Sequence, residues 1–301
     1  MKKDFLSIAD LTKNELEELF EITKELKQKP YGTVLRHKTL VMLFEKASTR
    51  TRLSFEAGIG HFEGRPIYID ASTSQLSRGE TVPDTARVME RFVQGIIARV
   101  YKHEMLVELA KNSHIPVINA LSDLEHPCQT LADLYTVLEK AGTFKGQKIA
   151  YVGDGDNVCN SLMLGCALLG IEFSAATPWK YKPNARIYAK SKKLAGDKIR
   201  WYEDPFKAVM DASFVYTDVF VSMGDEAQAA ERLKTFIPKY TVTAELMAHA
   251  RKGAKFMHCL PAHRGQEVAA EVIDGPNSIV FDQAENRLHA QKALLKMLYT
   301  R

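Results

Sequence analysis

The chain of 301 residues has little of what marks secreted, membrane-embedded or fibrous proteins. Its four cysteines form no CxxC pair, which argues against a disulfide framework in a small secreted domain. It contains no uninterrupted apolar run of about 18 residues, so no transmembrane helix is expected. The N-terminal MKKDFLSIAD lacks the apolar segment of a signal peptide. Gly and Pro, at 17 and 11 residues, are too few for a collagen-like chain. We therefore expect a globular cytoplasmic protein.

A strong excess of charge of one sign is also missing. Lys and Arg number 41 and Asp and Glu 37, which gives a formal net charge of +4. That excess is too small and scattered to indicate a nucleic-acid partner, and no membrane partner is expected. Hydrophobic residues at 46% and charged residues at 26% are ordinary for a soluble protein. At roughly 150 residues per domain, the length predicts about two domains.

Short apolar runs alternate with stretches of helical periodicity along the whole chain. Strands are predicted at 39–44, 66–69, 95–101, 116–121, 148–152, 172–176, 199–202, 214–220, 255–260 and 278–281. Predicted helices lie between most of them, including 127–140, and 285–300 is helical by pattern. This alternation predicts an α/β protein with two doubly wound domains, each a parallel sheet flanked by helices. The Gly-punctuated turn at 141–146 predicts a boundary between domains at 1–141 and 142–284. The C-terminal segment 285–301 could pack back on the first domain, which periodicity alone does not decide.

The segment Ser48-Thr49-Arg50-Thr51-Arg52 follows the predicted strand at 39–44 and opens a helix. Ligands of parallel sheets bind at the carboxyl ends of the strands, and a helix N-terminus offers free N–H groups to anions. Hydroxyl and guanidinium donors add to them. The segment therefore predicts a phosphate cradle; the alternative is a solvated helix cap with surface arginines.

A second helix start follows the strand at 116–121, where Pro127 occupies the first helical position. His126 and Gln129 would lie beside it. A neutral imidazole and an amide suit a ligand with a carbonyl and an amide group, although an ordinary capped helix would have the same pattern.

The run Gly153-Asp-Gly-Asp-Asn157-Val158 follows another strand and resembles the start of a dinucleotide-binding fingerprint. The third glycine is missing, because Val158 stands in its place. We expect a tight turn that presents Asn157 to a ligand, and no nicotinamide cofactor.

Two further strand ends carry polar side chains. Asp218 could pair with an ammonium group, and the turn at 222–224 could offer donors to a carboxylate, so the pair suits an amino acid; a plain strand-end turn is the alternative. His258, Cys259 and His263 resemble a metal cluster, but neighbouring side chains of a strand point to opposite faces, and a tetrahedral site needs convergence. We therefore expect no metal at His258, Cys259 and His263. We expect the thiol of Cys259 to line a substrate pocket.

Together these segments resemble the aspartate/ornithine carbamoyltransferase family. The matching segments follow the family order at 44–52, 84–87, 98–99, 126–129, 153–157, 218–224, 258–261 and 285–287. The motifs STRTR and HPCQ resemble those that bind carbamoyl phosphate throughout the family. The motifs D-x-x-x-S-M-G and HCLP resemble its ornithine branch. Asp156 departs from the pattern, since many members carry Asn there.

The resemblance implies that carbamoyl phosphate and L-ornithine react to L-citrulline and phosphate in arginine metabolism, without cofactor or metal. It implies a carbamoyl-phosphate domain at 1–141 with 285–301, an ornithine domain at 142–284, and a site between them in a homotrimer. The residues that it assigns to carbamoyl phosphate are Ser48, Thr49, Arg50, Thr51, Gln75, Arg99, His126, Gln129, Cys259, Leu260 and Arg287. Those that it assigns to ornithine are Asn157, Asp218, Ser222 and Met223. The catalytic residues would be Arg99, His126, Cys259 and Arg287, and Gln75 would serve the neighbouring subunit.

Three alternatives remain open at this point. A relative that carbamoylates aspartate, putrescine or a modified ornithine is the first, although a free α-amino acid suits Asp218 and Ser222 better. A dehydrogenase is the second, on the incomplete glycine fingerprint. The third is an amino-acid-binding module without catalysis, which would form no citrulline.

Overall fold

The computed structural model describes residues 3–222, 224 and 226–300. The chain forms two compact units, one of residues 1–135 with 285–301 and the other of residues 136–284. Each unit contains one sheet in which all strand pairs are parallel. The predicted fold class is therefore confirmed. The units divide within a helix, between Tyr135 and Thr136, and the division expected at 141/142 stays a prediction.

The sheet of the first unit has the strand order β2-β1-β3-β4. Its strands are β1 (Thr39–Phe44), β2 (Arg65–Asp70), β3 (Gly95–Arg99) and β4 (Val117–Leu121). The helices of this part of the chain are α1 (Lys13–Gln28), α2 (Thr49–His61), α3 (Val82–Phe92), α4 (His103–Lys111), α5 (Pro127–Ala141) and α12 (Val280–Tyr299). Short 3-10 helices are η1 (Ile8–Asp10), η2 (Ala71–Thr73) and η3 (Gln75–Arg78). Every residue of β3 and β4 is buried, as expected for strands covered by helices on both faces.

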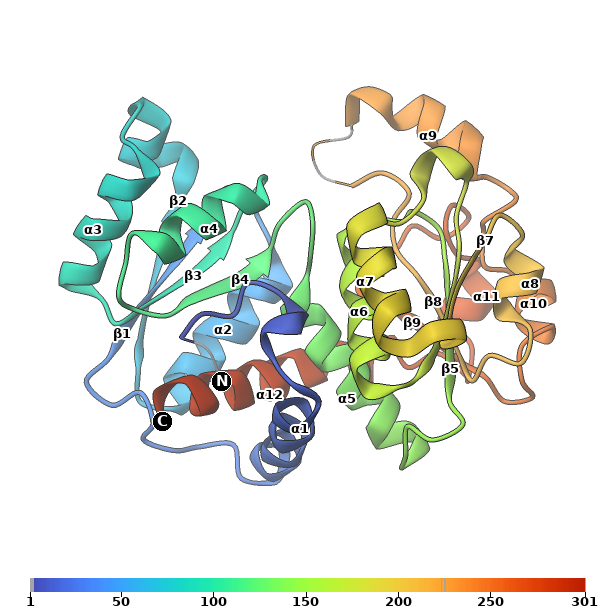
Figure 1. Cartoon of the computed structure of the whole chain (residues 1–301), viewed down its shortest axis with the longest axis horizontal. Coiled ribbons are helices and arrows are strands. Elements are labelled where there is room, and N and C mark those ends of the chain that lie inside the picture. The colour runs from blue at the N-terminus through green and yellow to red at the C-terminus, as the bar shows by residue number, and fades with distance from the viewer. Residues whose placement is uncertain (1–2, 223, 225, 301) are drawn as a thin grey trace. The chain divides into compact units, whose positions relative to one another are not determined.

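The sheet of the second unit has the order β7-β6-β5-β8-β9. Its strands are β5 (Lys148–Val152), β6 (Glu172–Ala176), β7 (Ile199–Tyr202), β8 (Phe214–Thr217) and β9 (Lys255–His258). The helices are α6 (Asn157–Leu169), α7 (Ala185–Ala195), α8 (Pro205–Val209), α9 (Ala229–Phe236), α10 (Ala244–Ala248) and α11 (Ala270–Ile273), and the 3-10 helices are η4 (Trp179–Tyr181), η5 (Gly196–Lys198) and η6 (Glu226–Gln228). In Figure 1, α6 and α7 lie on one face of this sheet and α8, α10 and α11 on the other.

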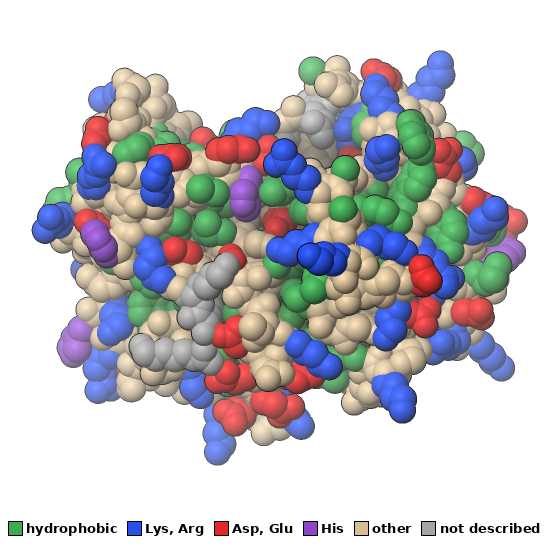
Figure 2. All heavy atoms as spheres, viewed as in Figure 1, with side chains coloured by type: hydrophobic (Ala, Val, Ile, Leu, Met, Phe, Trp, Pro, Cys, Tyr) green, Lys and Arg blue, Asp and Glu red, His purple; other side chains and the backbone are tan. Residues whose placement is uncertain are grey.

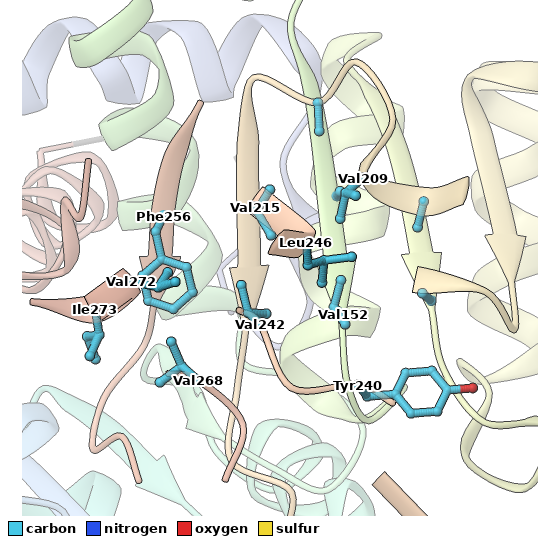
Figure 3. Close-up of a cluster of buried hydrophobic side chains, with 14 of the residues drawn as sticks. Val152, Val209, Val215, Tyr240, Val242, Leu246, Phe256, Val268, Val272 and Ile273 are labelled. Carbon is cyan, nitrogen blue, oxygen red and sulfur yellow. The ribbon is translucent and has the colours of Figure 1, made fainter. Parts of the chain in front are cut away.

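Valine is the commonest residue in the main buried cluster of the second unit. Val152 and Val215 on neighbouring strands pack with Val242, Leu246 and Phe256 (Figure 3). Branched side chains lose little freedom in strands and fill the space between sheet and helix. This core fixes the carboxyl ends of β5, β8 and β9, from which the polar segments 153–157, 218–224 and 258–261 emerge.

The predicted strand at 278–281 is wrong. Ser278 forms only an isolated bridge with Phe256, and Val280 is already the first residue of α12. A short apolar run cannot be told from the start of a buried helix by periodicity. The strands predicted at 214–220 and 255–260 end earlier, at Thr217 and His258. The residues beyond them leave the sheet and belong to the candidate site.

No helix within the described parts of the chain is long and apolar enough to cross a membrane. On the face seen in Figure 2, basic and acidic side chains are interspersed, in agreement with the small net charge.

Candidate active site

The segment 48–52 forms the N-terminal turn of α2, as predicted. Ser48 caps the helix: its Oγ accepts from the Thr51 N–H at 3.3 Å and donates to Thr51 Oγ1 at 2.9 Å. Thr49 is exposed, Arg50 is half-buried and Thr51 is buried. Arg52 is engaged elsewhere, because it pairs with Glu56 and lies over the Tyr68 ring. The motif therefore presents one guanidinium, that of Arg50, beside the helix N-terminus.

Four further predicted residues lie almost fully buried in the first unit. Arg99 ends β3, His126 and Gln129 begin α5, and Arg287 lies on α12; each exposes 6% or less of its surface. The Arg287 Nη2 donates to Thr51 Oγ1 at 2.9 Å. The C-terminal helix thus joins the predicted cradle through a direct hydrogen bond.

Burial, supported by the charges of this cluster, keeps the imidazole of His126 neutral. Burial, followed by the positive charges of Arg287 and Arg99, holds the pKa of His126 well below its ordinary value. Burial also raises the pKa of the neighbouring Cys128 thiol to about 12, and its Sγ donates to the Asn119 carbonyl. Cys128 is therefore an unreactive core thiol, whereas His126 is a neutral hydrogen-bonding group among cations.

Gln129 is oriented by a partner on its own helix. Its Nε2 donates to Asp133 Oδ1 at 2.8 Å, while its Oε1 is buried with no hydrogen-bond partner among the residues described. Because the amide nitrogen is engaged, the oxygen is the atom left to accept from a ligand. Gln75 is different: it is exposed on η3, and among the described residues no side-chain hydrogen bond or ion pair joins it to segment 48–52.

In the second unit, the turn after β5 brings Asn157 to the start of α6. Asp156 caps this helix by accepting from the Val158 N–H at 3.1 Å. Gly155 donates its N–H to the Tyr181 carbonyl at 2.8 Å. A Cβ on Gly155 would lie 2.3 Å from Pro183 N, so only glycine fits this close approach. The predicted tight turn is therefore held against the segment after β6, and its presentation of Asn157 to a ligand stays a prediction.

The ends of β8 and β9 bring Asp218 and Cys259 together. The Cys259 Sγ donates to Asp218 Oδ1 at 2.9 Å, and the same oxygen accepts from the Val219 N–H at 2.8 Å. Leu260 follows with a left-handed φ of 59° and donates its N–H to His258 Nδ1 at 2.8 Å. Strained backbone of this kind concentrates at functional sites. Ser222 is half-buried, and Met223 lies outside the described residues.

Acidic groups dominate this second cluster. Burial raises the pKa of Asp218, although His258 and the Cys259 hydrogen bond oppose the rise. Burial and the charges of Asp218 and Asp154 hold the pKa of Asp156 well above its ordinary value. The site therefore favours a cation over an anion.

The sequence argument that strand alternation keeps His258 and Cys259 apart is wrong, whereas His263, the third residue of the predicted set, is not part of the cluster found among the described residues. One ligand atom each of Asp218, His258 and Cys259 lies within 4.8 Å of the other two. The convergence arises because β9 ends at His258, so the strand alternation does not extend to Cys259. His258 Nδ1 accepts from Leu260 and its Nε2 faces Glu267 Oε1 at 3.3 Å. Nδ1 is thus already engaged within the protein, whereas the Nε2 contact with Glu267 is no hydrogen bond of standard geometry.

Sequence reasoning missed a buried ion pair in the second unit. Arg232 on α9 pairs with Asp154, which follows Gly153 in the turn after β5. The only signal available was the position of Arg232 one helical turn before Phe236, on the same side of α9. A single arginine beside an apolar position does not identify its partner.

Comparison with known proteins was made against this geometry. The family model "Aspartate/ornithine carbamoyltransferase, carbamoyl-P binding domain" matches residues 3–139, and the model "Aspartate/ornithine carbamoyltransferase, Asp/Orn binding domain" matches residues 145–298. The ornithine carbamoyltransferase of Carboxydothermus hydrogenoformans is 52% identical over 303 residues, covering 98% of this chain and 97% of the relative. That of Bacillus subtilis is 50% identical, covering 98% and 93%. The solved structure of the Pyrococcus furiosus ornithine carbamoyltransferase superposes with a TM-score of 0.93 at 50% identity, covering 97% and 96% of the two chains.

Proposed function

The chain belongs to the aspartate/ornithine carbamoyltransferase family, and we propose that its two polar clusters bind the two substrates of an ornithine carbamoyltransferase. The enzyme transfers the carbamoyl group of carbamoyl phosphate to the δ-amine of L-ornithine, which gives L-citrulline and phosphate. We assign carbamoyl phosphate to residues 1–141 with 285–301, ornithine to residues 142–284, and the reaction to arginine biosynthesis.

The phosphate of carbamoyl phosphate binds at the N-terminus of α2. Ser48, Thr49 and Thr51 supply hydroxyl and backbone donors, and Arg50 supplies a guanidinium for bidentate contact. The leaving phosphate gains negative charge as the C–O bond breaks, so these donors stabilise the transition state more than the ground state. The capping of α2 by Ser48 supports this assignment because it fixes the first turn.

The carbamoyl group is held by Arg99, His126, Gln129 and Arg287. Arg99, Arg287 and the neutral His126 donate to the carbonyl oxygen, on which negative charge develops in the tetrahedral transition state. Gln129 Oε1 accepts from the carbamoyl NH2. The lowered pKa of His126 supports this role, because an imidazole that stays neutral donates without adding a further charge.

Ornithine binds in the second cluster through its α-ammonium and α-carboxylate groups. Asp218 accepts from the α-ammonium. The α-amino acid group is also contacted by Asn157, after β5, and by Ser222 and Met223, after β8. Cys259 and Leu260 lie by the δ-amine. That amine resembles lysine, with an ordinary pKa of about 10.4, and desolvation favours the neutral form that attacks. The buried acidic character of this cluster supports a cationic substrate.

We further propose a cytoplasmic homotrimer in which Gln75 reaches the site of the neighbouring subunit. Its exposed position on η3 supports this role. All four cysteines are free thiols, a state that a reducing compartment preserves.

Light scattering should give three times the mass of the chain. A mixture of Gln75→Ala and Arg50→Ala subunits should regain activity that neither variant has, because mixed trimers contain sites with neither change.

The observation that carries the site assignment is the hydrogen bond from Arg287 to Thr51, which joins the C-terminal helix to the cradle. The direct test is citrulline formation by the purified protein from carbamoyl phosphate and L-ornithine. L-aspartate and putrescine serve as competing acceptors in parallel reactions. Carbamoylation of either in preference to ornithine would contradict the substrate assignment.

A further inference from the structure

We propose that Arg232 is a positioning residue that fixes the spacing between the two ornithine-binding segments of the second unit. The proposal rests on the ornithine site proposed above. The place of Arg232 in the mechanism is to hold the backbone that carries the assigned ornithine ligands.

The guanidinium of Arg232 joins two loops that are distant in sequence. Its Nη2 pairs with the carboxylate of Asp154, in the turn that leads to Asn157. Its Nε donates to the carbonyl of Phe220 at 2.6 Å, and Phe220 lies between Asp218 and Ser222. One rigid, planar side chain therefore sets the separation of the turn after β5 from the loop after β8.

Arg232 is held in place by its own surroundings. It exposes only 5% of its surface, and its guanidinium carbon lies 4.8 Å from the Tyr181 ring centroid and 5.8 Å from that of Phe236. Phe236, one turn further along α9, stacks on Phe220 at 4.7 Å with an interplanar angle of 12°. The loop after β8 is thus fixed to α9 through both a polar and an aromatic contact.

The turn on the opposite side of the guanidinium is equally constrained. Gly155 donates to the Tyr181 carbonyl at 2.8 Å, and the same Tyr181 presents its ring to Arg232. Asp154 exposes only 8% of its surface. Because both anchor points are fixed, replacing the guanidinium should shift the backbone that carries Asn157 and Asp218. Substrate binding is sensitive to such shifts in position.

A fork-shaped donor suits this task better than an ammonium. Arginine offers five N–H donors in fixed directions and serves the carboxylate and the carbonyl at once. Lysine would keep the charge opposite Asp154 but carries a compact ammonium on a flexible stem. Arg232→Lys therefore separates the positioning role from charge compensation.

The test measures substrate constants and thermal unfolding of Arg232→Lys in the full-length protein. The apparent ornithine constant should rise by about tenfold, while the carbamoyl-phosphate constant stays within about twofold. Binding of L-norvaline, which has the α-amino acid group of ornithine without the δ-amine, should weaken by the same factor. Arg264→Lys is the matched control, because Arg264 forms a bidentate pair with Asp274 on the exposed surface of the same unit.

A second variant distinguishes positioning from stability. Asp154→Leu combined with Arg232→Met removes both charges, and such apolar replacement of a buried ion pair is often neutral for stability. This double variant should melt near wild type yet bind norvaline about tenfold more weakly. Wild-type norvaline affinity in both Arg232→Lys and the double variant would overturn the proposal, as would a loss of affinity that only accompanies unfolding at the assay temperature.

Failure of this inference and failure of the ornithine assignment give different results. If Asp218→Asn weakens norvaline binding and the Arg232 variants do not, the ornithine site stands and the positioning role falls. If Asp218→Asn also binds norvaline normally, the site assignment itself is wrong.

Discussion

The two candidate subsites treat buried charge in opposite ways. In the first unit, Arg99 and Arg287 lie nearly fully buried. Burial and their positive charges lower the pKa of His126 and keep its imidazole neutral. In the second unit, burial raises the pKa values of Asp218 and Asp156. Asp154 forms a buried ion pair with Arg232. One cluster is suited to a dianion and the other to an ammonium group.

This difference shows how each site discriminates between substrates that both carry charge. Charges interact more strongly in a buried site than in water, so each cluster gains most from a ligand of the opposite sign. Under the proposed assignment, the cationic cluster repels the ammonium groups of ornithine, and the acidic cluster repels phosphate. Specificity thus arises from repulsion as much as from attraction.

The largest expected effect is that of Arg50→Ala on the cationic side. Loss of a charge-assisted contact to a desolvated phosphate should cost about 2–4 kcal/mol in transition-state stabilisation, with little change in thermal stability. Steady-state kinetics with varied carbamoyl phosphate measure it. Arg52→Ala is the matched control, since Arg52 belongs to the same motif but is engaged with Glu56 and Tyr68. If Arg52→Ala lost as much activity as Arg50→Ala, the special role of Arg50 in phosphate binding would be contradicted.

On the acidic side, Asp218→Asn should raise the apparent ornithine constant by about 1.5–3 kcal/mol in free energy. The asparagine keeps an oxygen for the Val219 N–H and the Cys259 thiol, so the loop should stay folded. Thermal melting measured beside the kinetics is the control. A lowered melting temperature with a normal ornithine constant would mean that Asp218 only supports the turn.

A smaller effect is expected for Asp156→Asn, which keeps the helix cap. A carboxyl group whose native pKa is raised binds its proton more tightly when folded, so stability is lost as pH rises from its ordinary pKa toward the raised one. The variant should therefore be more stable at pH 7 by on the order of 1 kcal/mol, and the gain should vanish near pH 3. Urea unfolding at the two pH values measures it; an equal gain at both would exclude the buried charge as its cause.

The smallest effect concerns His126. Because its pKa lies well below the ordinary value, its protonation should not change between pH 6 and 8. At each pH, the apparent carbamoyl-phosphate constant of His126→Gln is divided by that of the wild type. This ratio should change by less than about twofold between pH 6 and 8. A ratio that changes with a midpoint near pH 6.5 would show that the imidazole titrates in the site.

Much of the fold could be predicted because the strands are short, apolar and separated by helical periodicity. The strands at 39–44, 148–152, 172–176 and 199–202 have the predicted bounds. The segment 278–281 could not be assigned because the first turn of a buried helix and a buried strand have the same local pattern.

Less of the site could be predicted, because its contacts join segments far apart in the chain. The motif at 48–52 predicts a helix N-terminus, but nothing local indicates that Arg287 reaches Thr51 across 236 positions. The pairing of Arg232 with Asp154 is equally invisible, since either residue alone is an ordinary charged side chain. Asp218 and Cys259 converge because β8 and β9 are neighbours, which the sequence does not state.

The most direct test of the account is a crossed measurement of both substrate constants in Arg50→Ala and Asp218→Asn, each at a saturating concentration of the other substrate. We predict that Arg50→Ala raises the carbamoyl-phosphate constant at least about tenfold and that Asp218→Asn raises the ornithine constant by a similar factor, each leaving the other constant within about twofold. If both variants raise the same constant, or if the two effects are exchanged, the assignment of the cationic cluster to carbamoyl phosphate and of the acidic cluster to ornithine is contradicted.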